Sequence, residues 1–565
     1  MQKIQTHKIQ CDVAVIGGGT AGLNTAIGAA EKGADVLVVD KAPIERSGAI
    51  AGGIDHFMAY LESGEPWDTR EAYLQYAARV AKGTVNLKVQ EKVFCDELFP
   101  ALERMEKIFG NSLRLKGRSE LYRTQSMGQP GPYWINFDGK KLKPKMAKAV
   151  RRAGCRVLDS VQVTNLFLHQ GELAGFTGFH IRTGDFYQVQ AKAVVISTGS
   201  ANRMFKAQGD NPFNLWYCPA CTGDLHRAAY DVGVEMANVE FIRMTIVPKG
   251  LSAPGFNAFF GMGSKLVNAL GEEFMENYHP MGIKAPRNWI VWATMMEIKE
   301  GRSPIFIDCS HLTRTEREHL FGTLGVDKDT LPEFLAAKGY LEEGTRIEVT
   351  LSEPMNARPG EMVGSGVKID ENCASNIPGI FAAGDSSDQM GCLHVCTTGG
   401  YLAGKNAALY AQQTTAFRDL SAKAMTEERK RVFRPLENEQ GLNPRELEDT
   451  VRDIATANFG PIKSAQSLTT AIEKLDRLDS VLPTLRAANL HELLRCHEAI
   501  NIQQWAKVPA YASLARRESR TIPYHYRVDY PETNDGEFCG LIVVRRGERG
   551  EATTRFEAID YSAYL

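Results

Sequence analysis

The sequence predicts an α/β fold whose centre is a βαβ unit near the start of the chain. Residues 13–16 form a short, β-branched apolar run, which is typical of a buried parallel strand. Residues 36–39 form a second such run, which ends at Asp40. Between the two runs lie three glycines at the spacing G-x-G-x-x-G, namely Gly17, Gly19 and Gly22. Strand, glycines, helix, strand and acid in this order predict a Rossmann-like, dinucleotide-binding domain.

The residues of this unit suit a pyrophosphate and a ribose. The first glycine allows a sharp turn, the second lets a pyrophosphate approach the backbone, and the third lets helix and strand pack closely. At Thr20 and Ala21 the helix begins, where free N–H groups and the helix dipole attract anions. Asp40, followed by Lys41, can accept a hydrogen bond from a ribose 2′-hydroxyl. The alternative is a tight turn without a ligand, and the motif alone does not separate NAD from FAD.

Two later segments repeat the pattern of an apolar strand that ends at a glycine. Strand 193–197 runs into Thr198-Gly199, and another apolar strand runs into Gly384-Asp385. Because the carboxyl ends of parallel strands share one ligand crevice, we expect both ends near the same nucleotide. The glycine-rich helix after Asp385 predicts a second backbone anion site. The further cofactor-binding residues that we expect are Ser47, Gly48, Gly52, Gly53, Thr398, Gly399 and Gly400.

Composition limits the classes of function. The 565 residues, 43% of them hydrophobic, predict two to four domains. With 66 Lys+Arg against 68 Asp+Glu, the chain has no bulk attraction to nucleic acid or to an anionic membrane. The first ten residues lack an apolar signal core, and no run approaches the roughly 20 apolar residues of a membrane span. The 11 scattered cysteines suit reduced thiols, so we expect a cytoplasmic protein.

The middle of the chain predicts a substrate region. Residues 69–109 have helical periodicity, and residues 155–189 alternate as hairpins do. Residues 209–300 combine aromatic residues and glycines with a few cations, including Arg243 and Arg287, a mixture that suits an anionic substrate under a lid.

Four motifs together resemble one family. They are DVAVIGGGTAG…VLVVDK, Ser197-Thr198-Gly199, PGIFAAGD and the RRESR segment at 516–520. They resemble the flavoprotein subunits of succinate dehydrogenase, fumarate reductase and adenylylsulfate reductase over nearly the whole chain. The resemblance implies FAD, with Asp40 at the adenosine ribose and Asp385 at the ribityl side. It also implies an FAD-binding domain at 1–240 and 350–415 with a helical insertion at about 60–140, an inserted α+β capping domain at 241–349, a C-terminal helical domain at 416–520 and a tail at 521–565.

Single residues distinguish among the members of the family that the chain resembles. Succinate dehydrogenases carry a His after Arg-Ser that bonds to the flavin; Gly48 stands here, which implies non-covalent FAD. Fumarate and succinate enzymes use arginines in H-G-A-N-R-x-G-G and R-G-E-G-G patterns, and a His in F-H-P-T. All three are missing here, where the chain has His394-Val-Cys-Thr-Thr-Gly399-Gly400, Phe260-Gly-Met-Gly-Ser and Phe241-Ile242-Arg243.

The segment from His394 to Gly399 is instead similar to H-K-F-S-S-G of the adenylylsulfate reductase alpha subunit, whose His faces flavin and substrate. Trp216 likewise matches a pocket Trp of that family. The family's pocket Asn, in an I-N-T pattern, is matched by Asp55, whose carboxylate would repel a phosphosulfate. The resemblance is therefore closest to dissimilatory adenylylsulfate reductase alpha, with its exact substrate open.

We expect a small anionic substrate between the flavin and three catalytic residues. His394 would donate a proton or hold the anion, unless it is a core histidine. Arg243 would bind a carboxylate, sulfonate or phosphate, unless it forms an ion pair between domains. Trp216 would border the pocket, unless it is a core residue.

The cysteines leave two further interpretations open. Cys218-x-x-Cys221 and Cys392-x-x-x-Cys396 fit a metal cluster or a redox disulfide, but we expect no metal on this chain. The enzymes that the chain resembles pass electrons to iron-sulfur centres on a separate polypeptide, and this chain lacks a C-x-x-C-x-x-C-x-x-x-C-P run. The resemblance therefore implies a hetero-oligomer with a ferredoxin-like, iron-sulfur beta subunit.

The expected activity is that of an FAD-dependent oxidoreductase that exchanges two electrons between a small anion and this partner. One alternative is a fumarate reductase-like or other organic-acid reductase or oxidase that reoxidises its flavin with a quinone or oxygen. A second alternative is a flavin electron-transfer or assembly subunit without substrate turnover.

Overall fold

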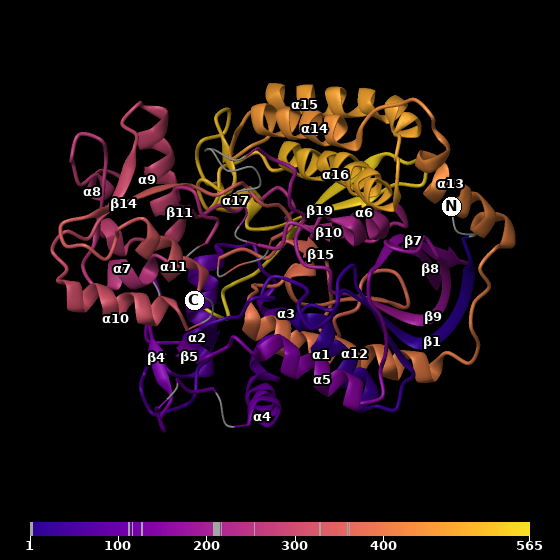
Figure 1. Cartoon of the computed structure of the whole chain (residues 1–565), viewed down its shortest axis with the longest axis horizontal. Helices are drawn as coiled ribbons and strands as arrows, with labels where there is room; N and C mark the ends of the chain where they lie inside the picture. The colour runs from indigo at the N-terminus through magenta and orange to yellow at the C-terminus, as the bar shows by residue number, and fades with distance from the viewer. Residues whose placement is uncertain are drawn as a thin grey trace.

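The centre of the computed structural model is a seven-stranded mixed sheet, at the right of Figure 1. The structure describes residues 4–110, 113–115, 117–125, 128–206, 215, 217–253, 255–326, 329–358, 360 and 362–565. The strands run in the order β6-β2-β1-β9-β8-β7, and β16 also pairs with β9. Their bounds are β1 Thr6–Ile16, β2 Val36–Val39, β6 Arg156–Leu158, β7 Val161–His169, β8 Glu172–His180, β9 Phe186–Ile196 and β16 Ile380–Ala382.

The parallel part of this sheet places the three predicted nucleotide segments at one edge. β1 pairs in parallel with β2 and β9, and β9 pairs in parallel with β16. The register joins Ile16 to Val39 and to Ile196, and Ile196 to Ala382. The glycine turn, Asp40, Thr198-Gly199 and Gly384-Asp385 therefore all leave the same edge of the sheet, as the sequence predicts.

Small residues allow two helices to pack closely on this sheet. They are α1 (Thr20–Ala30) and α12 (Leu393–Gln413). A Cβ on Gly400 would lie 2.5 Å from the Ala21 carbonyl oxygen, and one on Gly404 would lie 2.0 Å from that of Thr25. Helix α5 (Leu142–Arg152) also contacts α1. The glycines at the start of α12 thus serve helix packing.

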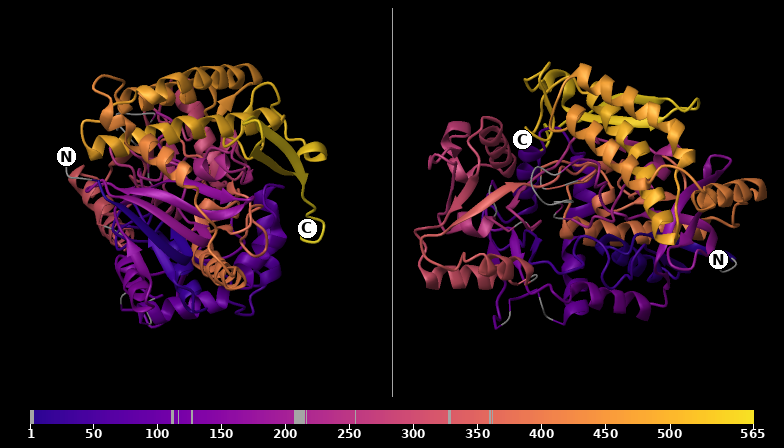
Figure 2. Two further views of the ribbon diagram at one scale, coloured as in Figure 1. Left: turned by 90° about the vertical axis from the view of Figure 1, so that its right-hand side faces the viewer. Right: turned by 45° about the horizontal axis from the view of Figure 1, so that its top comes forward.

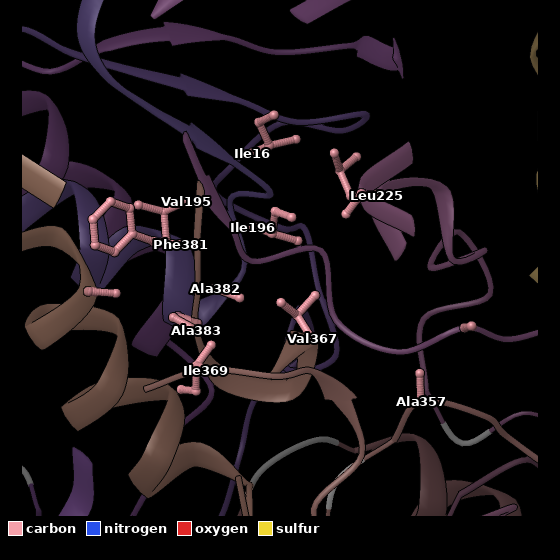
Figure 3. Packing of buried hydrophobic residues seen from close by; sticks show 14 of the residues in the cluster. Ile16, Val195, Ile196, Leu225, Ala357, Val367, Ile369, Phe381, Ala382 and Ala383 are labelled. Atoms are coloured by element: carbon pink, nitrogen blue, oxygen red, sulfur yellow. The ribbon is translucent and has the colours of Figure 1, made fainter. Parts of the chain in front are cut away.

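The core continues from the sheet into neighbouring loops (Figure 3). Ile16, Val195 and Ile196 lie beside Phe381 and Ala382 from β16. Leu225 and Val367 lie near them in the same view. These apolar side chains bring the edge of the sheet together with the segments that border the cofactor region.

The insertion between β2 and β6 differs from the helical prediction for residues 60–140. It contains α2 (Arg70–Ala81), α3 (Leu87–Gln90), the π-helix Glu91–Cys95 and α4 (Leu98–Phe109). It also contains a three-stranded antiparallel sheet, β3-β5-β4. These strands are β3 His56–Met58, β4 Tyr122–Thr124 and β5 Trp134–Asn136. Strands this short carry little periodic signal, so the sequence pattern did not reveal them.

The capping region, residues 241–349, has a core of its own and lies at the left of Figure 1. Its four-stranded sheet has the order β11-β14-β13-β12. Helices cover this sheet, and apolar side chains from helices and strands form one cluster. The elements are β11 Ile246–Pro248, α7 Asn257–Gly261, β12 Lys265–Val267, α8 Met275–Tyr278, α9 Arg287–Lys299, β13 Ile305–Asp308, α10 Arg314–Leu324, α11 Thr330–Ala337 and β14 Arg346–Leu351.

The C-terminal helices, coloured orange and yellow, lie in the upper part of both views of Figure 2. They are α13 Ala422–Glu437, α14 Pro444–Asn458, α15 Ala465–Arg477 and α16 Leu490–Ala515. The tail forms β19 (Gly540–Arg546) and β20 (Ala552–Ala558), which join β10 (Met236–Ala237) and β15 (Gly366–Val367) in one sheet. The tail is therefore integrated with earlier parts of the chain. Among the described helices, none combines the length and apolarity needed to cross a lipid bilayer.

A buried ionic network joins the C-terminal helices to the nucleotide region. Arg203 pairs with Glu448 at 2.6 Å and with Glu498 at 2.8 Å. Lys41 pairs with Asp224 at 2.8 Å and with Glu498 at 3.2 Å. The predicted cofactor residue Lys41 thus has carboxylate partners within the protein.

We expect Glu448→Ala to destabilise the protein by about 3–5 kcal/mol, because it leaves the buried Arg203 guanidinium undercompensated. The thermal unfolding midpoint should fall by several degrees. Glu446→Ala, at an exposed position of the same helix, is the matched control and should change little. An equal midpoint for the two variants would contradict this role of the network.

Candidate functional site

One cavity of about 680 Å³ lies between the main sheet, the three-stranded sheet of the insertion and the capping region. All three parts contribute side chains to its wall. From the nucleotide region, the predicted residues on this wall are Gly17, Gly19, Thr20, Ala21, Asp40, Lys41, Ser47, Gly48, Gly53, Thr198, Gly199 and Asp385. The structure therefore brings most of the predicted cofactor residues together in a volume typical of a ligand pocket.

The start of helix α1 has the features of an anion site. Its N-cap is Gly19, which offers no side-chain cap to the first N–H groups, and Gly19 and Thr20 line the cavity. The buried Thr198 hydroxyl oxygen has no hydrogen-bond partner within the described part of the chain. A polar atom left without a partner at a cavity wall is typical of a place where a ligand supplies one. These residues fit the pyrophosphate of a dinucleotide such as FAD.

Asp40 is held in place by backbone N–H groups. Gly18 N donates to Oδ2 at 2.5 Å and Ala42 N donates to Oδ1 at 2.7 Å. Burial raises the pKa of Asp40, although both N–H groups favour its charged form. Each oxygen keeps further acceptor capacity, so this geometry allows the predicted contact with a ribose hydroxyl.

Asp385 has a partner that the sequence analysis missed. Arg358 lies 3.4 Å from the Asp385 carboxylate, and its guanidinium stacks over the Tyr217 ring at 4.1 Å. Burial opposes the charge of Arg358, but Asp385 and the Tyr217 oxygen hold the pKa of Arg358 above its ordinary value. Asp385 and Tyr217 line the cavity. Residue 358 lies 27 positions before residue 385, so no short sequence motif includes both residues.

Six of the predicted cofactor residues are not among the residues that line the cavity. A Cβ on Gly22 would come within 1.8 Å of the Gly17 carbonyl oxygen, so Gly22 serves helix–strand packing. Thr398 donates to the His394 carbonyl oxygen within its own helix. The six residues are Gly22, Gly52, Gly384, Thr398, Gly399 and Gly400.

His394 is placed among aromatic side chains. It is 2% exposed, with its ring centroid 5.0 Å from that of Phe94 and 6.3 Å from that of Phe57, and the cavity lining does not include it. Cys392, Leu393 and Cys396 of the same segment line the cavity instead. Because an α-helix advances 100° per residue, the face that carries residues 392, 393 and 396 points away from residue 394. The role of His394 beside flavin and substrate stays a prediction, and Trp216 lies outside the described residues.

Two arginines from the capping side reach the cavity wall. Arg243 is mostly buried, and its guanidinium lies against Gly360, where a Cβ would come within 1.8 Å of Nη1. Arg287 is the first residue of α9 and half-buried. Within the described ranges, no side chain forms an ion pair or hydrogen bond with Arg287. A cation without a protein partner at a cavity wall can bind an anionic ligand.

The three-stranded sheet contributes a polar and aromatic wall. His56 Nδ1 lies 2.6 Å from Asp55 Oδ1. The His56 ring stacks on Trp134, with ring centroids 4.2 Å apart and an angle of 17° between the ring planes. Asp55, His56, Trp134 and Tyr122 all line the cavity. The sequence shows Asp55 and His56 as neighbours, but Trp134 reaches them only through the pairing of β3 with β5.

All four cysteines of the two predicted motifs line the same cavity: Cys218, Cys221, Cys392 and Cys396. A hydrogen bond from the Cys221 thiol lowers the pKa of Cys218, while the pKa of Cys221 is raised. In the described part of the chain, no three His, Cys, Asp or Glu side chains converge as a metal site would require. These four thiols therefore form part of the cavity wall.

Comparisons with known proteins agree with this geometry. The FAD binding domain family matches residues 12–396, and the fumarate reductase flavoprotein C-term family matches residues 448–564. One relative is a component of the fumarate reductase (CoM/CoB) of Methanothermobacter marburgensis. It is 24% identical over 96% of this chain and 99% of that protein.

Solved structures show the same fold. Adenylylsulfate reductase from Archaeoglobus fulgidus has a TM-score of 0.86 at 22% identity, covering 99% of this chain and 97% of that one. The FrdA chain of E. coli quinol fumarate reductase has a TM-score of 0.81 at 21% identity, covering 98% of this chain and 97% of that one. The chain therefore belongs to the fumarate reductase and succinate dehydrogenase flavoprotein family of FAD-dependent oxidoreductases.

Proposed function

We propose that this chain is the catalytic component of an FAD-dependent enzyme that exchanges two electrons between a small anionic substrate and an iron-sulfur partner. The observation that carries the proposal is the shared cavity. Arg287 and Arg243 line it together with the nucleotide-binding residues Gly19, Asp40 and Asp385. A substrate anion bound by these arginines lies in the same chamber as the cofactor, which is the proximity that electron exchange requires.

FAD, when bound, supplies the redox chemistry, and the chain supplies position and charge. The start of α1 and Thr198 would hold the pyrophosphate, Asp40 the adenosine ribose, and Asp385 the ribityl chain. Gly48, with φ +80°, offers no side chain to bond with the flavin, and its Cβ position lies 3.1 Å from the Gly19 Cα. This supports non-covalent FAD, and acid precipitation of the protein should release all of the flavin into solution.

A small organic acid suits the pocket better than adenylylsulfate does. The adenylylsulfate prediction rested on His394 and Trp216, and His394 does not line the cavity. The Asp55 carboxylate does line it and is about half exposed, so it would repel a phosphosulfate. A compact organic acid at Arg287 needs less of the cavity, so its carboxylates can lie farther from Asp55.

A ferredoxin-like iron-sulfur protein remains the proposed electron partner. The proposal rests on the way this family is assembled, since the relative from M. marburgensis is itself one component of a fumarate reductase made of more than one chain. Slow reoxidation of the reduced flavin by air, and fast reoxidation by a co-purified iron-sulfur protein, would support this partner over oxygen or a quinone.

The experiment is an anaerobic titration of the FAD-loaded chain, followed by the visible absorbance of the flavin. Succinate, L-malate, L-aspartate and sulfite with AMP are added separately, and sulfite without AMP controls for direct addition to the flavin. Photoreduced enzyme is tested with fumarate. We expect one organic acid to bleach or restore the flavin.

Bleaching that requires both sulfite and AMP would instead support adenylylsulfate chemistry. Reduction through an iron-sulfur protein alone, with no response to any anion, would contradict the proposal and support a role in electron transfer only.

A further inference from the structure

The pair Asp55 and His56 has the geometry of an oriented proton carrier. The two side chains are 2.6 Å apart, from Oδ1 to Nδ1. An ionised carboxylate can only accept a hydrogen bond, so Nδ1 carries the hydrogen. Nε2 is then the nitrogen that can take up or release a further proton.

Stacking fixes the plane of the His56 ring. The ring lies on the Trp134 indole at 4.2 Å with an interplanar angle of 17°. Trp134 is itself 9% exposed and belongs to β5, which pairs with β3 so that His56 faces Asn136. With one nitrogen held by Asp55 and one face held by Trp134, the imidazole has little rotational freedom left.

The surroundings place this ring in the substrate chamber. His56 and Asp55 line the cavity that also contains Arg287 and the nucleotide residues. The capping region approaches this wall, since a Cβ on Gly128, between β4 and β5, would lie 3.9 Å from Cγ of Pro286, the residue before Arg287. The proton carrier and the anion-binding arginine therefore belong to one chamber.

We propose that His56 is the catalytic acid–base residue of this enzyme, positioned by Asp55 and Trp134, and that the substrate is a small organic acid oxidised or reduced at carbon. This inference rests on the proposed function and names its proton carrier and substrate class. Electron exchange with a phosphosulfate needs no proton carrier, whereas dehydrogenation of a carbon acid does.

In the direction of oxidation, Nε2 of His56 acts as the base. The substrate would lose one C–H proton to Nε2 of His56. Bound FAD would accept the hydride equivalent, two electrons with one proton, and a double bond would form in the substrate. In the direction of reduction, protonated His56 returns the proton to carbon as the hydride equivalent arrives. Arg287 holds the carboxylate in both directions.

Titratable groups lie around the His56 ring on several neighbouring elements. Asp55 is a charged group in direct contact with the ring, at 2.6 Å. On the paired strands, Asn136 is neutral and Tyr122 is the titratable side chain of the wall. His394 of α12 lies near Phe57 on the next position of β3, and Arg287 and His319 line the cavity from the capping region. Removal of Asp55 should therefore lower the pKa of His56, since it removes the nearest negative charge.

The first test does not depend on turnover. Diethyl pyrocarbonate acylates neutral imidazole, so its rate at His56, read by peptide mass spectrometry on the FAD-loaded protein, reports the pKa of this residue. We expect Asp55→Asn to shift the midpoint to lower pH by about one unit or more. His279, which tilts against Trp289 outside the cavity lining, is the internal reference and should not shift.

The second test uses the organic acid that reduces the flavin. In wild type, kcat/KM should rise with pH through the pKa of His56, because the base must be neutral. Asp55→Asn should move this limb to lower pH, and His56→Gln should abolish it and lower kcat by about 10²–10⁴-fold. His279→Gln should keep the wild-type profile and rate.

The outcomes separate the two proposals. An unchanged acylation midpoint in Asp55→Asn would overturn the coupled pair. Turnover that His56→Gln leaves intact would overturn the acid–base role while the proposed function stands. Failure of every organic acid to reach the flavin would overturn the proposed function and the catalytic role with it, even if the pair titrates together.

Discussion

Gly22→Ala is expected to yield a protein that purifies without FAD. Its Cβ would lie 1.8 Å from the Gly17 carbonyl oxygen and 2.7 Å from the Ser197 hydroxyl oxygen. Because one neighbour is backbone, α1 must move away from β1, and the N–H groups at its start must move with it. Overpacking of this kind costs about 1–3 kcal/mol. FAD affinity should fall tenfold or more, as measured by flavin content after gel filtration and by titration with free FAD.

Gly322→Ala is the matched control for this prediction. Gly322 belongs to α10, and in the described part of the chain no atom beyond its own stretch of helix lies within 4 Å of its Cβ position. This variant should retain FAD and unfold at a temperature no lower than wild type. Wild-type FAD affinity in Gly22→Ala would refute the packing role assigned to this glycine.

Arg287→Met is expected to slow anion turnover by about 10²–10³-fold while FAD remains bound. The guanidinium lines the cavity without a partner in the described part of the chain, so its loss does not strand a protein carboxylate. Removal of one charged donor from a reacting site typically lowers the rate by about 10²–10³-fold. The measurement is the rate of flavin reduction by the responsive acid under anaerobic stopped flow.

Arg314→Met is the control for the loss of a positive charge in the same region. Arg314 is exposed and pairs with Glu318 along α10. It should reduce flavin at the wild-type rate. Equal rates for Arg287→Met and wild type would show that the anion binds elsewhere.

Local order made the nucleotide region predictable. The strand, the glycines and Asp40 are close in sequence, and β2 has the bounds that the apolar run predicts, Val36–Val39. The distal segments at Thr198-Gly199 and Gly384-Asp385 were also placed correctly at one sheet edge, because parallel strands end together. In this region each motif follows a strand, and parallel pairing alone brings the strand ends together.

The substrate side was less predictable because its contacts are long-range. His394 was assigned by spacing, but the cavity face of α12 carries residues 392, 393 and 396. Trp134 meets His56 only after two strands of three residues pair. Arg358 finds Asp385 across a loop. Helical phase gives the first of these three placements, whereas the other two depend on tertiary structure.

The most direct test of the account is the stoichiometry of flavin reduction in the wild-type protein. The FAD-loaded chain, free of other redox proteins, is mixed anaerobically with increasing amounts of the organic acids. We expect one of them to bleach the flavin fully, to the two-electron level, or to reoxidise the photoreduced flavin to the same extent. A flavin that is neither reduced nor reoxidised by any acid, yet is reduced by an iron-sulfur protein, would contradict this expectation.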